Sequence, residues 1–225
     1  MVDPKKIIIA LDYDHIDDAL ALADNLNPDL CRLKIGKELF TKYGLEIVFK
    51  IQKKGFEIFL DLKFHDIPTT VYKACISAFS LNVWMINIHL SGGLNMVEAA
   101  MRARLDCESS SKLIGVTVLT SLSDEDCLSI YGCSRENELL RLKDIALKAN
   151  IDGFVCSPYD ISVLKDSTKI YVTPGIRFGD DKHDHHKAAG PKEALSLGSH
   201  YLVIGRSVTG NANPNETLKK IVNSL

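Results

Sequence analysis

The sequence lacks a long apolar run and a block of charge of one sign. Its first apolar run, Ile7–Leu11, stops at Asp12, too early for a signal-peptide core, and no stretch approaches the ~20 apolar residues of a membrane span. The 27 Lys and Arg residues nearly balance 29 Asp and Glu residues and are dispersed, so no groove for a polyanion is indicated. We therefore expect a cytoplasmic protein that binds no nucleic acid and no membrane, although a small anion remains a possible ligand.

The six cysteines lack the spacing of metal ligands. None forms a C-x-x-C pair, and no histidine accompanies them at zinc-finger spacing. Free thiols in a reducing compartment are therefore expected. The 225 residues, 46% of them hydrophobic, suffice to bury a core without a disulfide or a structural metal. No Ser- or Gly-rich linker interrupts the chain, so residues 1–225 are expected to form a single domain.

Short apolar, β-branched runs recur along the whole chain and predict strands. Between them lie segments with helical periodicity, such as Ile16–Leu26 and Glu136–Ala149. Apolar strands that alternate with helices predict a parallel sheet covered on both faces, and eight of them favour a TIM (β/α)8 barrel. The runs are Ile7–Asp12, Cys31–Gly36, Glu57–Leu62, Trp84–Leu90, Leu113–Leu119, Gly153–Ser157, Ile170–Pro174 and Tyr201–Gly205.

An open doubly wound sheet is the alternative architecture. It normally shows a Gly-rich turn after the first strand, where this sequence reads Asp12-Tyr-Asp-His. A barrel instead places its active site at the carboxyl ends of its strands, and polar residues follow nearly every apolar run. These residues are Asp12, Lys34, Asp61, Lys63, His89, Thr120, Ser121, Ser157, Arg177, Gly205 and Arg206.

The densest polar cluster follows the third run. Asp61 and Lys63 are two residues apart, which on a strand directs both side chains to one face. Burying both charges is unfavourable unless they are paired. Lys34 is expected beside Asp61 from the neighbouring strand, and Asp66 follows where the chain leaves its own strand. This array of alternating charge is either catalytic or a structural ion-pair network at the barrel rim.

The last two strands indicate a phosphate site. Tyr201–Gly205 ends in Gly205-Arg206 at the start of a helix, and the preceding strand ends near Arg177. Phosphate sites in this fold use the loops after strands seven and eight together with backbone N–H groups at a helix N-terminus. Gly205 allows close approach and Arg206 offers bidentate hydrogen bonds, although Gly205 can also be a plain turn residue.

These residues together resemble the bacterial type of the orotidine 5′-phosphate decarboxylase family. The resemblance covers nearly the whole chain and implies a TIM barrel that converts orotidine 5′-monophosphate (OMP) to uridine 5′-monophosphate (UMP), the last step of de novo UMP biosynthesis, without a cofactor. The segments that carry it are Leu33–Phe40, Asp61–Pro68, Val118–Ser121, Pro174–Arg177 and Val203–Arg206.

The resemblance implies a role for each site residue. Lys63 donates a proton to C6 of the pyrimidine, and Lys34, Asp61 and Asp66 complete a charged network. Asp66 and Thr70 reach into the partner subunit's site, which implies a homodimer. The implied substrate contacts are Asp12 and Lys34 at the ribose, Thr120 and Ser121 at the pyrimidine, Arg177, Gly205 and Arg206 at the phosphate, and also Asp61, Ile67, Thr70 and Pro174.

One position departs from the family pattern. His185 stands where the family's phosphate-gripping loop usually has Gln. Imidazole can donate to phosphate but lacks the paired donor and acceptor of an amide, which puts loop closure and its pH dependence in doubt. His183, His185 and His186 could together bind a metal, but a solvated loop is the favoured interpretation, and no metal site is expected.

Two other functions remain open at this point. A metal-dependent phosphosugar decarboxylase or aldolase on the same barrel would need carboxylates that converge on a divalent cation, whereas the position facing Asp61 is Lys34. A non-catalytic nucleotide-binding barrel is the second, and an interior ammonium such as that of Lys63 argues against it.

Overall fold

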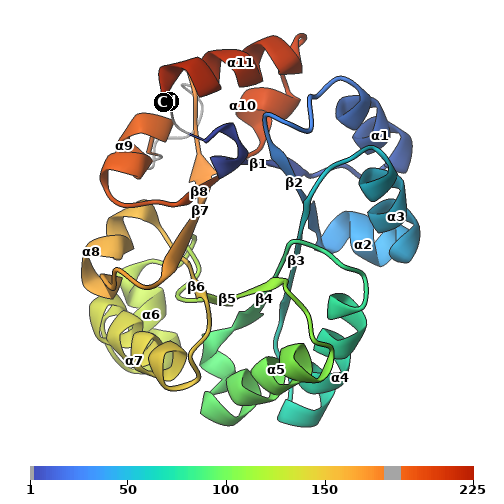
Figure 1. Ribbon diagram of the computed structural model, residues 1–225. Coiled ribbons are helices and arrows are strands. Elements are labelled where there is room, and N and C mark those ends of the chain that lie inside the picture. The colour runs from blue at the N-terminus through green and yellow to red at the C-terminus, as the bar shows by residue number, and fades with distance from the viewer. Residues whose placement is uncertain (1–2, 180–188) are drawn as a thin grey trace. The chain divides into compact units, whose positions relative to one another are not determined.

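The computed structural model describes residues 3–179 and 189–225, and its fold is the predicted (β/α)8 barrel (Figure 1). The strands are parallel and follow one another in chain order around a closed barrel, which excludes the open doubly wound sheet. The strands are β1 (Ile7–Leu11), β2 (Arg32–Gly36), β3 (Ile58–Phe64), β4 (Met85–His89), β5 (Lys112–Val116), β6 (Gly153–Val155), β7 (Ile170–Ile176) and β8 (Tyr201–Ile204).

Helices connect the strands. The α-helices are α1 (Ile16–Asp24), α2 (Lys37–Tyr43), α3 (Leu45–Lys53), α4 (Pro68–Phe79), α5 (Leu94–Asp106), α6 (Asp124–Tyr131), α7 (Arg135–Lys148), α8 (Ile161–Leu164), α9 (Pro191–Ser196), α10 (Arg206–Thr209) and α11 (Pro214–Ser224). The short 3-10 helices are η1 (Pro4–Lys6), η2 (Leu90–Gly92) and η3 (Pro158–Asp160).

Each predicted apolar run overlaps one strand, and the largest difference lies at β5. That strand was expected to continue to Leu119 but ends at Val116. The chain then bends into a turn in which the Leu122 N–H donates to the Leu119 carbonyl at 3.1 Å. The apolar side chains alone therefore did not reveal where β5 ends.

The chain comprises two compact units, of which the first is Met1–Leu62 together with Thr173–Leu225. In this unit β1 pairs with both β2 and β8, and Ile9 is the partner of Leu33 and Ile204. These three side chains are fully buried. Because both neighbours and both faces of β1 are covered, its sequence reads as an unbroken apolar run rather than as an alternating one. Helix α1 packs against α3 outside β1 and β2 (Figure 1).

The second unit is Lys63–Val172. Strand β5 pairs with β4 on one side and β6 on the other, and β6 pairs with β7. Helices α4 and α5 lie side by side and pack closely (Figure 1). The rings of Phe154 and Tyr171 stack with centroids 5.9 Å apart, which places aromatic area on adjacent strands.

All six cysteines are free thiols, as expected. Burial raises the pKa of Cys31 and of Cys75 to about 12, so these thiols stay protonated near neutral pH. In the described ranges, no helix combines the length and the apolar character that a bilayer crossing needs.

The packing of β6 on β7 predicts that Gly153→Ala is strongly destabilising. Gly153 is the partner of Ile170, and a Cβ at Gly153 would lie 2.0 Å from the Ile170 carbonyl oxygen. Because that atom belongs to the backbone, the strands must separate, and we expect the free energy of unfolding to fall by about 1–3 kcal/mol or more. Urea denaturation followed by circular dichroism measures this.

Gly190→Ala is the matched control. The nearest atom to a Cβ there is the Arg177 carbonyl oxygen at 4.0 Å, so no steric clash is expected. Only the N-cap residue of α9 changes, which should lower the free energy of unfolding by about 1 kcal/mol or less. Equal losses in the two variants would contradict the steric explanation.

Candidate active site

Seven of the predicted site residues converge on one cavity in the first unit. The cavity has a volume of about 280 Å³ and lies at the carboxyl ends of the strands. The structure therefore brings these residues together, as the barrel prediction requires, while their individual roles remain predictions. The seven are Asp12, Lys34, Asp61, Pro174, Arg177, Gly205 and Arg206.

The ammonium of Lys34 lies between two carboxylates. Lys34 Nζ donates to Asp12 Oδ1 at 3.0 Å and lies 3.5 Å from Asp61 Oδ2, which confirms that Lys34 is beside Asp61. The side chains of Lys34 and Asp61 are each only 11% exposed, whereas that of Asp12 is 64% exposed. A nearly buried charge is thus neutralised from both sides while one partner stays open to solvent.

The segments after β7 and β8 form the predicted phosphate end of the cavity. Gly175, which has a φ of 76° in the left-handed region, separates Pro174 from Ile176 near the end of β7. The Phe178 N–H donates to Ser207 Oγ at 3.1 Å, so the segment after Arg177 is tied to the one that begins with Arg206. Two guanidinium groups therefore line a single cavity, an arrangement that suits an anion.

Lys63 has an unusual backbone conformation. Its φ is 51°, in the left-handed region, where a residue with a Cβ is disfavoured by roughly 1–2 kcal/mol. The two-residue alternation of an ideal strand is interrupted there, so the inference that Asp61 and Lys63 share a face does not follow from strand geometry. The Lys63 N–H donates to Asn87 Oδ1 at 2.8 Å.

Asn87 is a further candidate site residue, which the sequence did not predict. It lies on β4, its side chain is fully buried, and its amide oxygen accepts from the backbone of the predicted proton donor. A buried amide is tolerated in a core when its hydrogen bonds are satisfied. The available signal was a lone Asn inside the apolar run Trp84–Leu90.

The segment after Lys63 is exposed. Asp66 Oδ1 accepts from the Ile67 N–H at 2.6 Å, and Ile67 is 66% exposed although it is apolar. Pro68 begins α4, and Thr70 is exposed in its first turn. These positions suit the predicted contacts of Asp66 and Thr70 with a second subunit, which remain predictions.

Thr120 and Ser121 do not lie at a strand end as predicted. They are the two exposed central residues of the turn Leu119–Leu122, after β5. This placement leaves their side chains on the surface of the second unit.

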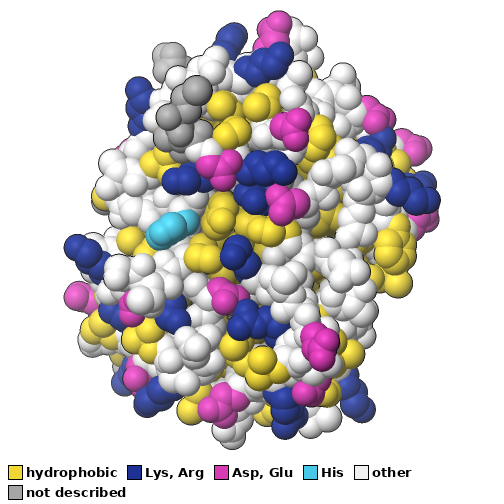
Figure 2. Space-filling view, viewed as in Figure 1, with side chains coloured by type: hydrophobic (Ala, Val, Ile, Leu, Met, Phe, Trp, Pro, Cys, Tyr) yellow, Lys and Arg dark blue, Asp and Glu magenta, His cyan; other side chains and the backbone are white. Residues whose placement is uncertain are grey.

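Charge on the face shown in Figure 2 is mixed, with Lys and Arg side chains interspersed among Asp and Glu. Over residues 3–179 and 189–225, no three His, Cys, Asp or Glu side chains group as metal ligands. His183, His185 and His186 lie outside the described residues.

Comparison with known proteins agrees with this geometry. The profile of the Orotidine 5′-phosphate decarboxylase / HUMPS family matches residues 5–221. The orotidine 5′-phosphate decarboxylase of Shewanella sediminis is 48% identical over 98% of this chain and 97% of its own length. That of Vibrio cholerae is 47% identical over the full length of both.

A solved structure shows the same fold. The orotidine 5′-phosphate decarboxylase of Lactobacillus acidophilus superposes with a TM-score of 0.83 at 32% identity, over 96% of this chain and 97% of that one. The family match and the superposition thus each cover nearly the whole chain. The chain therefore belongs to the orotidine 5′-phosphate decarboxylase / HUMPS family.

Proposed function

We propose that this chain decarboxylates orotidine 5′-monophosphate to uridine 5′-monophosphate, as a homodimer in the cytoplasm. The observation that carries the proposal is the cavity in which paired Lys34 and Asp61 stand together with Arg177 and Arg206. It combines a charged reaction centre with an anion site, in a chain 48% identical to a named decarboxylase.

The substrate is bound at three places. Arg177, Gly205 and Arg206 hold the phosphate, because two guanidinium groups beside a glycine can approach its oxygens closely. Asp12 and Lys34 bind the ribose hydroxyls. Thr120 and Ser121 bind polar atoms of the pyrimidine, and Pro174 and Ile67 also contact the substrate.

The proposed reaction relies on electrostatic stabilisation of a carbanion at C6 of the pyrimidine. The bond between C6 and the carboxylate carbon breaks, carbon dioxide leaves, and the electron pair stays on C6 in the ring plane, where the π system does not delocalise it. The ammonium of Lys63 stabilises that charge and then gives its proton to C6. Lys63 regains a proton from water before the next turnover. The reaction needs no cofactor to accept electrons, because the electron pair left on C6 forms the new bond to the proton.

Asp61 and Lys34 set the electrostatics of the reaction centre. Lys34 Nζ lies 3.5 Å from Asp61 Oδ2, and this pair places Asp61 near the departing carboxylate, whose ground state it destabilises. The same ammonium disfavours the metal-dependent alternative, because it would repel a divalent cation bound at Asp61. Asp66 and Thr70 complete the site of the partner subunit.

Lys63→Ala is expected to abolish turnover while it leaves much of the affinity for UMP. The proton donor is lost, but the predicted phosphate and ribose contacts remain. The measurement is the loss of OMP ultraviolet absorbance with EDTA present, together with UMP binding by calorimetry. Lys148→Ala, which removes an exposed lysine paired with Asp144 on α7, is the control and should keep full activity.

Substantial turnover by the Lys63→Ala protein would reject Lys63 as the donor. Activity of the parent protein that EDTA abolishes would instead favour the metal-dependent phosphosugar reaction.

Arg206→Ala is expected to weaken UMP binding by ~1.5–3 kcal/mol, the range for a hydrogen bond to a charged group. Uridine has no phosphate, so its inhibition constant should be the same in the variant and the parent. The comparison is made by competitive inhibition. If uridine and UMP inhibit the parent protein equally well, Arg206 holds no phosphate.

Asn87→Ala is expected to lower both stability and kcat. The substitution removes the acceptor of the Lys63 N–H, which should lower the free energy of unfolding by about 1–3 kcal/mol. It should lower kcat because the backbone of the proton donor is no longer held by this hydrogen bond. Ser111→Ala is the control, because Ser111 is also buried and its hydroxyl donates to a backbone carbonyl, that of Val83. It should lose stability and keep its kcat. A normal kcat in the Asn87→Ala protein would show that the bond serves folding only.

A further inference from the structure

The turn that carries Thr120 and Ser121 is a short surface segment. Its own hydrogen bond, from the Leu122 N–H to the Leu119 carbonyl, closes the turn but does not fix its position on the barrel. Leu119 is 38% exposed, so burial of its side chain holds the turn only in part. If this turn contacts a pyrimidine, other residues of the protein must fix its position.

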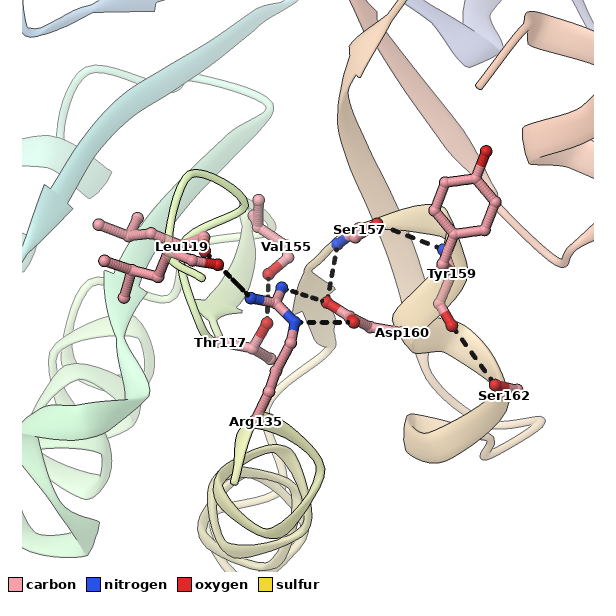
Figure 3. Close-up of polar contacts among 9 residues, drawn as sticks. Thr117, Leu119, Arg135, Val155, Ser157, Tyr159, Asp160 and Ser162 are labelled. Atoms are coloured by element: carbon pink, nitrogen blue, oxygen red, sulfur yellow. Dashed lines mark hydrogen bonds and ion pairs between the residues drawn. The ribbon is translucent and has the colours of Figure 1, made fainter. Parts of the chain in front are cut away.

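Arg135, the first residue of α7, contacts both ends of this turn. Arg135 Nη1 lies 3.3 Å from the Leu119 carbonyl oxygen and 3.4 Å from that of Leu122. One nitrogen with two N–H bonds therefore spans the residues on either side of Thr120 and Ser121. The bond to Leu119 is drawn in Figure 3.

The remaining nitrogens of the guanidinium are fixed by Asp160. Arg135 Nε donates to Asp160 Oδ1 at 3.1 Å and Nη2 donates to Oδ2 at 2.8 Å, a bidentate pair (Figure 3). The side chains are only 18% and 10% exposed, so neither charge readily moves into water. The Ser157 N–H in turn donates to Asp160 Oδ2 at 3.3 Å, which ties the carboxylate to the segment after β6.

We propose that Arg135, held by Asp160, is a positioning residue that fixes the Thr120–Ser121 turn for binding of the pyrimidine. This inference rests on the proposed function, in which that turn contacts the substrate. The planar guanidinium is required because its fork holds a carboxylate on one side while Nη1 reaches two carbonyls on the other. The side chain of lysine ends in a single nitrogen and has no planar fork, so it cannot bind the Asp160 carboxylate and the two carbonyls in this arrangement. The turn is then already ordered in the free protein, so substrate binding does not have to supply the free energy of ordering it.

Arg135→Lys tests the proposal, with Arg104→Lys as a matched control. Arg104 also forms a part-buried pair with an aspartate in this unit, Asp152, and its side chain has the same 18% exposure. Both variants should lose thermal stability to a similar degree. Only Arg135→Lys should lower kcat/KM for OMP, by on the order of 10-fold to 100-fold, chiefly through KM. Inhibition by inorganic phosphate should be the same in both variants and the parent.

A double-mutant cycle shows whether Arg135 acts through the turn. If it does, Ser121→Ala should cost much less in kcat/KM when combined with Arg135→Lys than it does alone. Asp160→Asn, which keeps the size of the side chain, should show the same signature more weakly and serves if Arg135→Lys does not fold.

The outcomes separate this inference from the function on which it rests. A folded parent protein without turnover of OMP would reject the proposed function. An active parent in which Arg135→Lys and Arg104→Lys have equal kinetic effects, or in which the effects of Arg135→Lys and Ser121→Ala simply add, would overturn the positioning role of Arg135 alone.

Discussion

The site is organised around the pairing of one nearly buried ammonium with two carboxylates. Lys34 projects from a strand whose other residues are almost all buried, and water can solvate little of it. Asp61 and Asp12 replace that water from two sides. Removing either carboxylate would leave the Lys34 ammonium with less compensation, so both carboxylates contribute to its burial. The same cavity is lined by Arg177 and Arg206, the arginines that follow β7 and β8.

The fold was predictable because the physics of a parallel barrel is visible in the sequence. Each strand is covered on both faces, so β1 and β8 read as uninterrupted apolar runs. Their carboxyl ends gather at one side, so a polar residue that stops a run is a candidate for the site. Lys34 and Asp61 were expected beside each other on these grounds, and their side chains are 3.5 Å apart.

The parts that were not predicted depend on backbone conformation. The sequence Asp61-Leu-Lys63 does not indicate that Lys63 has a φ of 51°. The left-handed conformation is associated with Gly and Asn rather than with Lys. The end of β5 was placed three residues too late, because Val118 and Leu119 have the apolar character of a strand although β5 ends at Val116. The Thr117 N–H still donates to the Val155 carbonyl of β6, at 3.1 Å. Propensity describes a residue, whereas these features are imposed by neighbours on other elements.

Three polar side chains outside the predicted set share one task. Asn87 accepts from the backbone of Lys63, Arg135 donates to the backbone on both sides of Thr120 and Ser121, and Ser207 accepts from the backbone after Arg177. Each binds a backbone N–H or carbonyl group, and nearly every residue offers both whatever its side chain. The sequence of the supported segment therefore does not identify the residue that binds it. Catalysis through preorganised charge requires such supports, since any rearrangement of the loops during the reaction would add to the barrier. The candidate reactive residues follow from polar positions at strand ends in the sequence, whereas supporting contacts such as those of Arg135 and Ser207 follow only from the fold.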